Sequence, residues 1–223
     1  MLTFAFGFDD KRPDFVISYY LSNLIIIFIL TALSILIIEI ATRYLAKKYT
    51  CEVEYTLWGI KRFFFGRYDT LKKKIPLGII FCILGAFITK GSFTFALLQN
   101  HKLKENQTLR SLRKNKHILE SEIAIINAVG PLTAVFLICL AKVLSIPALA
   151  TINSVLAIFL VIPFPSSDAM RFLFSAKFFY LFILVFVMTS TILLIYTGVI
   201  SAIIIAVIIA AIFLVLSIFQ TYK

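Results

Sequence analysis

The stretch FVISYYLSNLIIIFILTALSILIIEIAT, residues 15–42, decides the fold class of this chain. Residues 15–38 carry no formal charge, and about 20 apolar residues are enough for a helix to cross a bilayer. The first charge is Glu39, and a carboxylate costs roughly 2.5–3.5 kcal/mol at the centre of a transmembrane helix and less near its end. We therefore expect a membrane-spanning helix whose inner end carries one acid with a specific role.

Composition extends this expectation to the whole chain. The 223 residues are 61% hydrophobic with a mean hydropathy of +1.00, which is more apolar surface than a soluble domain of this size buries. The net charge of +11 comes from Lys and Arg in short segments beside apolar runs, as the positive-inside rule places them, so we do not expect nucleic-acid binding. The sequence predicts an all-α, multi-pass protein of the cell membrane, with its N-terminus outside and its C-terminus cytoplasmic.

Five or six transmembrane helices are expected. The clear runs are residues 15–46, 123–141, 148–162 and two within 178–222, broken near residues 196–198. Residues 75–89 form a further apolar run, but as a helix it would reach only about 22 Å against a hydrocarbon core of about 30 Å. Both flanks of this run are basic, so we predict that it re-enters the same side. A full crossing would be the alternative.

A small β element is expected after the first span. Residues 51–58, CEVEYTLW, alternate apolar and polar side chains, which indicates a strand with one wet face. Residues 92–98 alternate as well, and residues 61–74 are basic and typical of a membrane-surface loop. We divide the chain into an N-terminal segment (1–14, with a short strand or interfacial segment at 2–8), a membrane core (15–168) and C-terminal transmembrane helices (169–223).

The histidines and cysteines suggest no metal site by their spacing. His101 and His117 lie in a polar segment, too far apart for a ligand pair on one helix, and are expected to be solvated. Cys82 and Cys139 lie in apolar runs and are expected to be core residues, with no disulfide framework among the three cysteines.

Three segments, taken in order, resemble the site-2 protease family of intramembrane zinc metalloproteases, particularly its compact archaeal members. Residues 38–58 resemble the zinc helix with its H-E-x-x-H motif, followed by the edge strand that presents substrate. Residues 130–134, GPLTA, are similar to a G-P-x-x-N motif, and residues 153–168 resemble the segment that ends in L-D-G and brings the third zinc ligand. The resemblance covers about residues 15–168.

The departures from the family pattern fall on the chemistry that the resemblance implies. Ile38 and Thr42 stand at the two zinc-histidine positions, and neither is a plausible zinc ligand. Asp168 keeps the third-ligand position and Glu39 the general-base position, while Ala134 replaces the asparagine of the G-P-x-x-N motif. Because a catalytic zinc needs three protein ligands, we expect no metal and no cofactor.

Glu39, Asp168 and Asn153 are therefore candidates for relic polar positions, and each has a structural alternative. Glu39 precedes Arg43 by one helical turn, an ion-pair spacing worth about 0.2–0.5 kcal/mol on an exposed helix. Asp168 can cap a helix beginning at Ala169 or pair with Arg171, and Thr42 can bond to its preceding turn. Asn153 is expected to be an interhelical hydrogen-bond donor rather than a catalytic group.

The leading functional hypothesis is a non-catalytic membrane protein with a site-2-protease-like core. Its expected partners are the lipid bilayer and a transmembrane segment of another membrane protein, which it binds without cleavage. One alternative is an active metalloprotease with divergent ligands, which alone would require zinc. The other is a transporter, disfavoured because the spans carry few ionisable groups and no internal repeat is visible.

Overall fold

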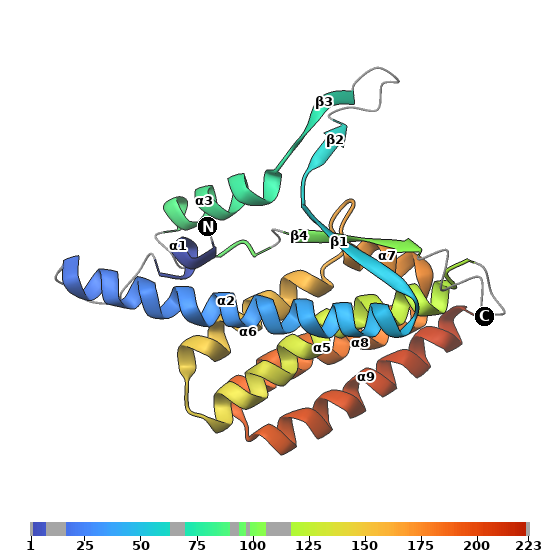
Figure 1. The fold of residues 1–223 in the computed structure, drawn as a ribbon. Coiled ribbons are helices and arrows are strands. Elements are labelled where there is room, and N and C mark those ends of the chain that lie inside the picture. The colour runs from blue at the N-terminus through green and yellow to red at the C-terminus, as the bar shows by residue number, and fades with distance from the viewer. Residues whose placement is uncertain are drawn as a thin grey trace.

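The computed structural model describes residues 2–7, 17–62, 70–89, 94–96, 99–105 and 117–221. It confirms an all-α polytopic membrane protein with a small β element (Figure 1). Within these ranges, four helices are long and apolar enough to cross a membrane: α2 (Ile17–Lys48), α5 (Glu120–Val143), α8 (Lys177–Tyr196) and α9 (Val199–Thr221). Two apolar helices are shorter, α3 (Leu77–Ile88) and α6 (Pro147–Val161).

Helix α5 occupies the centre of the bundle. It contacts α2, α6 and α8, and also the short helix α7 (Asp168–Ser175). The predicted break near residues 196–198 is confirmed, because α8 ends at Tyr196 and α9 begins at Val199. Helix α9 packs back against α8 through alanines one turn apart, Ala202, Ala206 and Ala210.

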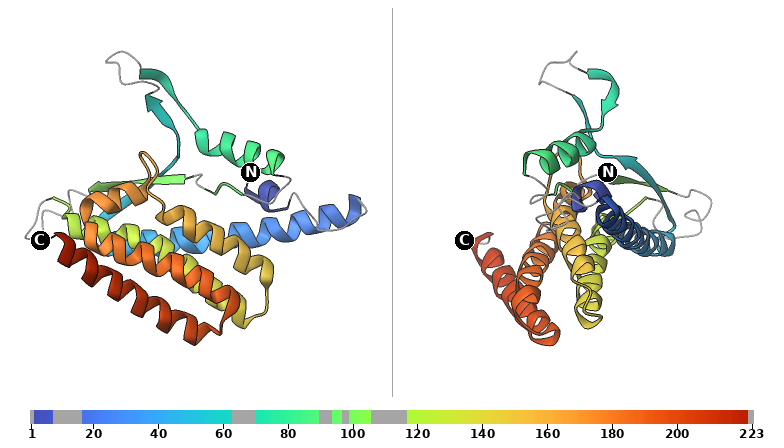
Figure 2. Two further views of the ribbon diagram at one scale, coloured as in Figure 1. Left: turned by 180° about the vertical axis from the view of Figure 1, so that it is seen from behind. Right: turned by 90° about the vertical axis from the view of Figure 1, so that its left-hand side faces the viewer.

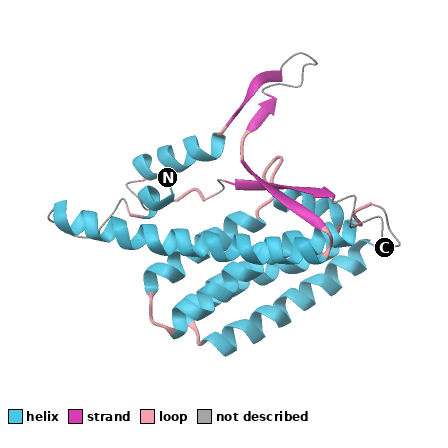
Figure 3. Cartoon of the chain, viewed as in Figure 1, coloured by secondary structure: helices cyan, strands magenta, loops and turns pink. Residues whose placement is uncertain are grey.

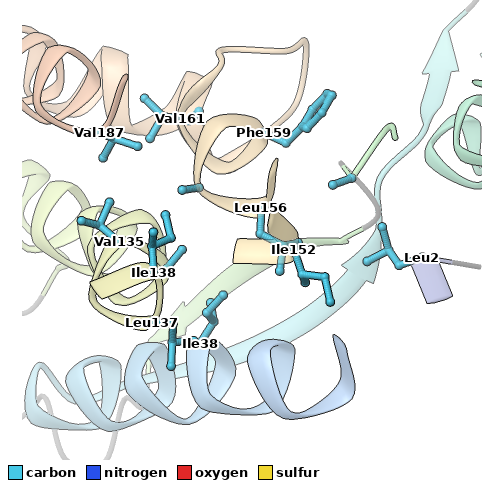
Figure 4. Close-up of a cluster of buried hydrophobic side chains, with 14 of the residues drawn as sticks. Leu2, Ile38, Val135, Leu137, Ile138, Ile152, Leu156, Phe159, Val161 and Val187 are labelled. Atoms are coloured by element: carbon cyan, nitrogen blue, oxygen red, sulfur yellow. The ribbon is translucent and has the colours of Figure 1, made fainter. Parts of the chain in front are cut away.

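The interior of the bundle is a largely aliphatic core. Ile38 of α2, Ile138 of α5, Ile152 and Leu156 of α6 and Val187 of α8 are buried in one cluster, part of which Figure 4 shows. Cys82 is fully buried, as expected, and Cys139 is partly buried. These side chains fix α2, α5 and α6 against one another where the candidate site lies.

Two strands cross the end of the bundle. Strand β1 (Cys51–Leu57), where a strand was predicted, pairs antiparallel with β4 (Gln99–Glu105), with Tyr55 opposite His101 (Figure 3). Within the second alternating stretch, residues 92–98, residues 94–96 carry no regular structure, and residues 92, 93, 97 and 98 lie outside the described residues. Alternation could not reveal β4, because the neighbours Asn100 and His101 are both buried and hydrogen-bonded to another element.

Two further expectations needed correction. Of the two alternatives expected for residues 2–8, the strand is wrong: residues 2–6 form a helix, α1 (Leu2–Phe6), because Leu2 and Ala5 on one face are buried where α1 meets α2 and α3. Residue 8 lies outside the described residues. The stretch predicted as a surface loop contains a hairpin of β2 (Ile60–Arg62) and β3 (Thr70–Ile75) that projects from the bundle (Figures 1 and 3). Residues 63–69 of that stretch lie outside the described residues.

Helix α3 is the short apolar run that was predicted to re-enter. Its 12 residues reach about 18 Å, well below the thickness of a bilayer core. On one face of α3, Cys82 and Ala86 are buried, one helical turn apart. Re-entry stays a prediction, but the length of the helix favours it over a full crossing.

Candidate functional site

The inner turn of α2 brings three sequence-predicted residues to one place. Ile38 and Thr42 share a helix face one turn apart, and both are buried. The Thr42 hydroxyl donates to the Ile38 carbonyl at 2.9 Å, as predicted. Glu39 keeps 28% of its side chain exposed and lies 3.9 Å from Arg43 Nη2, so the predicted ion pair is present.

Asp168 begins α7, but it does not cap that helix as one prediction proposed. Ser167 is the N-cap, and its Oγ accepts from the Met170 amide at 3.2 Å. The Asp168 carboxylate is directed instead to β4, where both of its oxygens accept from the His101 amide at 3.1 Å. The alternative partner Arg171 is confirmed, with Nη1 at 3.7 Å from Asp168 Oδ1.

His101 is the residue whose role the sequence did not reveal. It was expected to be solvated, yet only 7% of its surface is exposed. Its Nδ1 lies 2.6 Å from Asp168 Oδ2, and its carbonyl accepts from Arg171. The neighbouring Asn100 donates to the carbonyl of Ser166, so two consecutive residues of β4 are bonded to the corner between α6 and α7.

A small cavity of about 30 Å³ joins these elements. Polar side chains from α2, β1, β4, α5 and α7 line it, together with apolar groups of α2, α5 and α6: Glu39, Thr42, Tyr55, His101, Asn127 and Asp168, with Ile38, Ile126, Gly130, Pro131 and Leu160. The structure therefore brings Glu39, Asp168 and the Gly130–Pro131 pair to one cavity. A cavity of this size has room for a water molecule or another small polar group.

Asn153 does not belong to this cavity. It is fully buried in α6, and its Nδ2 donates to Ser34 Oγ of α2 at 3.0 Å and to the Leu149 carbonyl at 2.8 Å. The predicted interhelical hydrogen bond is confirmed.

Three buried polar atoms at the cavity find no hydrogen-bond partner among the described residues. They are His101 Nε2 and both amide atoms of Asn127, which sits in α5 with 7% of its surface exposed. Asn127 was missed in the sequence, where its signal was a carboxamide inside the apolar run 123–141. Because His101 Nδ1 bonds to the Asp168 carboxylate, Nε2 is the ring nitrogen that faces the cavity without a described partner.

Tyr55 connects the strand to the end of α2. Its hydroxyl donates to the Glu39 carbonyl at 3.3 Å, and its ring centroid lies 4.9 Å from Arg43 Cζ, a cation–π distance. Burial raises the pKa of the Tyr55 phenol above its ordinary 10.0, and the nearby Glu39 acts in the same direction, while Arg43 opposes both.

The residues present do not fit the zinc centre that the family resemblance implies. Ile38 offers no donor atom, and the Thr42 hydroxyl is bonded within its own helix. The described part of the chain contains no group of three or more His, Cys, Asp or Glu placed to hold a metal ion. What the arrangement can do chemically is hydrogen-bond a small polar group between His101 and Asn127.

Comparison with known proteins finds no family model that matches this chain, and no curated protein or solved structure that is significantly similar to it.

Proposed function

We propose that this chain is a non-catalytic membrane protein with a site-2-protease-like core, which binds a transmembrane segment of another membrane protein without cleaving it. The observation that carries the proposal is the convergence of three distant segments. Glu39, Asp168 and Gly130–Pro131, the positions on which the resemblance rests, line one cavity. A shared ancestry with the protease fold accounts for this convergence together with the loss of both histidine positions.

Strand β1 supplies the proposed binding surface. Among the strands that the structure describes, β1 pairs with β4 alone, so the middle of β1, Val53–Tyr55, forms an outer edge of this sheet. An extended segment can add to such an edge through backbone hydrogen bonds. Because Tyr55 belongs to β1 and lines the cavity, a segment added there would lie beside the candidate site.

The proposal includes no proteolysis because the residues at the cavity do not supply the ligands of a catalytic zinc. Glu39 occupies the general-base position of the family, where a glutamate takes a proton from a zinc-bound water. A catalytic zinc needs three protein ligands, and Ile38 and Thr42 supply none, so Glu39 has no such water to act on. The second candidate, a metalloprotease with divergent ligands, is favoured by one observation: His101 lines the same cavity as Glu39 and Asp168.

Charge supports the proposed orientation. Lys47 and Lys48 end α2, Lys102 and Lys104 lie exposed on β4, and Lys177 begins α8, all at the end of the bundle crossed by β1 and β4 (Figure 1). By the positive-inside rule we propose that this end is cytoplasmic, with the N-terminus outside the cell and the C-terminus in the cytoplasm.

Site-specific photo-crosslinking in native membranes tests the proposal. A crosslinking residue at Glu54, exposed on β1, should capture membrane proteins of unchanged length, and the same residue at Ile204, exposed on α9 and away from the sheet, is the matched control. Equal yields from the two positions would contradict binding at β1. A cut product that disappears in Glu39→Gln would establish the metalloprotease candidate instead.

A further inference from the structure

A second and much larger cavity lies at the opposite end of the bundle from the candidate site. It is a groove of about 430 Å³ between the last turns of α5, the first turns of α6 and the last turns of α8. Asn127 of the site and Lys142 of the groove both belong to α5 and are about 22 Å apart along it. The pair α5–α6 and the pair α8–α9 diverge toward this end (Figure 2).

The walls of the groove are mostly aliphatic, and most of their hydroxyl groups are already hydrogen-bonded. Ile138, Ala150, Val155 and Leu194 contribute aliphatic surface. Three hydroxyls on the helices that line it are occupied within their own helices: Thr151 donates to Pro147 at 3.1 Å, Ser154 to Ala150 at 2.8 Å and Thr191 to Val187 at 2.9 Å. The hydroxyl of Ser145, between α5 and α6, lies exposed near Lys142 at the polar end of the groove. The part of a ligand that lies between these walls is therefore expected to be a hydrocarbon chain.

Among the described residues that line the groove, one is a cation: Lys142, in the last turn of α5. Its Nζ donates to the carbonyls of Leu194 and Thr197, at the C-terminal end of α8. An ammonium group carries three N–H donors, so one remains for a ligand. Because this lysine lies at the end of two spans, its charge is at the depth where lipid headgroups begin.

We propose that this groove is a phospholipid site, in which an acyl chain fills the space between α5, α6 and α8 and the headgroup phosphate lies beside the Lys142 ammonium. Hydrocarbon walls and a single cation at the interfacial end match the two parts of a phospholipid. The volume falls within the range of about 300–1,000 Å³ typical of small-molecule sites, and lipid chains surround the groove in a bilayer. The proposal is independent of the partner binding proposed at β1.

Lipid retention during purification tests the site. The full chain, purified in a mild detergent, should retain about one phospholipid per chain when its extracted lipids are quantified by mass spectrometry. Thr151→Trp places a large ring in the groove from an exposed position and leaves Lys142 intact, so retention should fall at least fivefold. Ile204→Trp, on the exposed surface of α9, is the matched control and should retain lipid as the wild type does.

A second measurement does not depend on what survives purification. Adding phosphatidylglycerol to the delipidated wild type should raise its thermal unfolding midpoint, whereas Thr151→Trp and Lys142→Met should respond much less. Equal retention and equal thermal response in the wild type and Thr151→Trp would overturn the proposal. Stoichiometric retention of a free fatty acid in place of a phospholipid would also overturn it, because the assignment of the phosphate to Lys142 would then be wrong.

Discussion

Two N–H groups of His101 bind the carboxylate of Asp168, which lies 67 positions further along the chain. The imidazole Nδ1 and the backbone amide of His101 both donate to the one carboxylate. The contact fastens strand β4 to the first turn of α7 and orients the imidazole, in the way that carboxylates orient functional histidines elsewhere. It also means that Asp168 has a structural role whether or not a ligand ever reaches the cavity.

Removing this carboxylate should loosen β4. Asp168→Ala leaves the buried His101 donors without their acceptor, and we expect it to lower the free energy of unfolding by about 2–3 kcal/mol. Asp168→Asn keeps one acceptor oxygen and should lose about half as much. Denaturant unfolding in detergent measures both. A loss below about 0.5 kcal/mol for Asp168→Ala would show that β4 does not depend on this contact.

Asn127 and Asn153 form a matched pair with opposite expectations. The Asn127 carboxamide is buried without a partner among the described residues, so Asn127→Leu should stabilise the isolated protein by roughly 1 kcal/mol or more. Asn153→Leu breaks the bond to Ser34 and should destabilise it by about 1–2 kcal/mol. Denaturant unfolding in detergent measures the change in stability of both variants. Destabilisation by Asn127→Leu would mean that the amide has a bound partner in the folded state.

Restoring the two histidine positions tests the inherited geometry. Ile38→His with Thr42→His puts two imidazoles one turn apart on the cavity wall, and Asp168 lines the same cavity. We expect this double variant to bind zinc at close to one ion per chain by elemental analysis, and the wild type to contain far less. Adding Asp168→Ala should weaken the binding. A folded double variant without zinc would show that α2 and α7 do not meet as the resemblance implies.

The Tyr55 phenol should titrate above pH 10. Burial disfavours its charged form, so its folded pKa is raised, and the stability that it contributes is present below its unfolded pKa and is lost as pH rises through the folded pKa. The difference in phenolate absorbance between the wild type and Tyr55→Phe isolates this one group. A midpoint at or below 10 would show that the end of α2 does not shield Tyr55 from solvent.

Re-entry of the segment around α3 predicts that its two flanks lie on one side of the membrane. Single cysteines at Arg62 in β2 and at Lys102 in β4, in a background without the native cysteines, should both react with an impermeant reagent applied from the cytoplasmic side. Reaction from opposite sides would require α3 to be a full crossing despite its length of about 18 Å.

The membrane-spanning elements of this chain were determined by the sequence alone. Helix α2 and the α8–α9 hairpin follow from local composition, because a bilayer requires every backbone polar group within a spanning helix to be bonded inside its own segment. Strand β1, which pairs with β4 outside these spans, follows from its alternation of apolar and polar side chains. Contacts one turn apart are equally local, which is why the pairing of Glu39 with Arg43 and of Thr42 with Ile38 could be predicted.

Only the tertiary structure decided which polar groups meet. His101 looked like a solvated residue because its partner Asp168 is distant in the chain, and β4 showed no alternation because its side chains bond to the α6–α7 corner. Ser167 rather than Asp168 caps α7 for the same reason, since the carboxylate is held by β4. Local propensity cannot report a bond whose two ends are brought together by the packing of α2, α5 and α7, and the cavity between them exists only after that packing is complete.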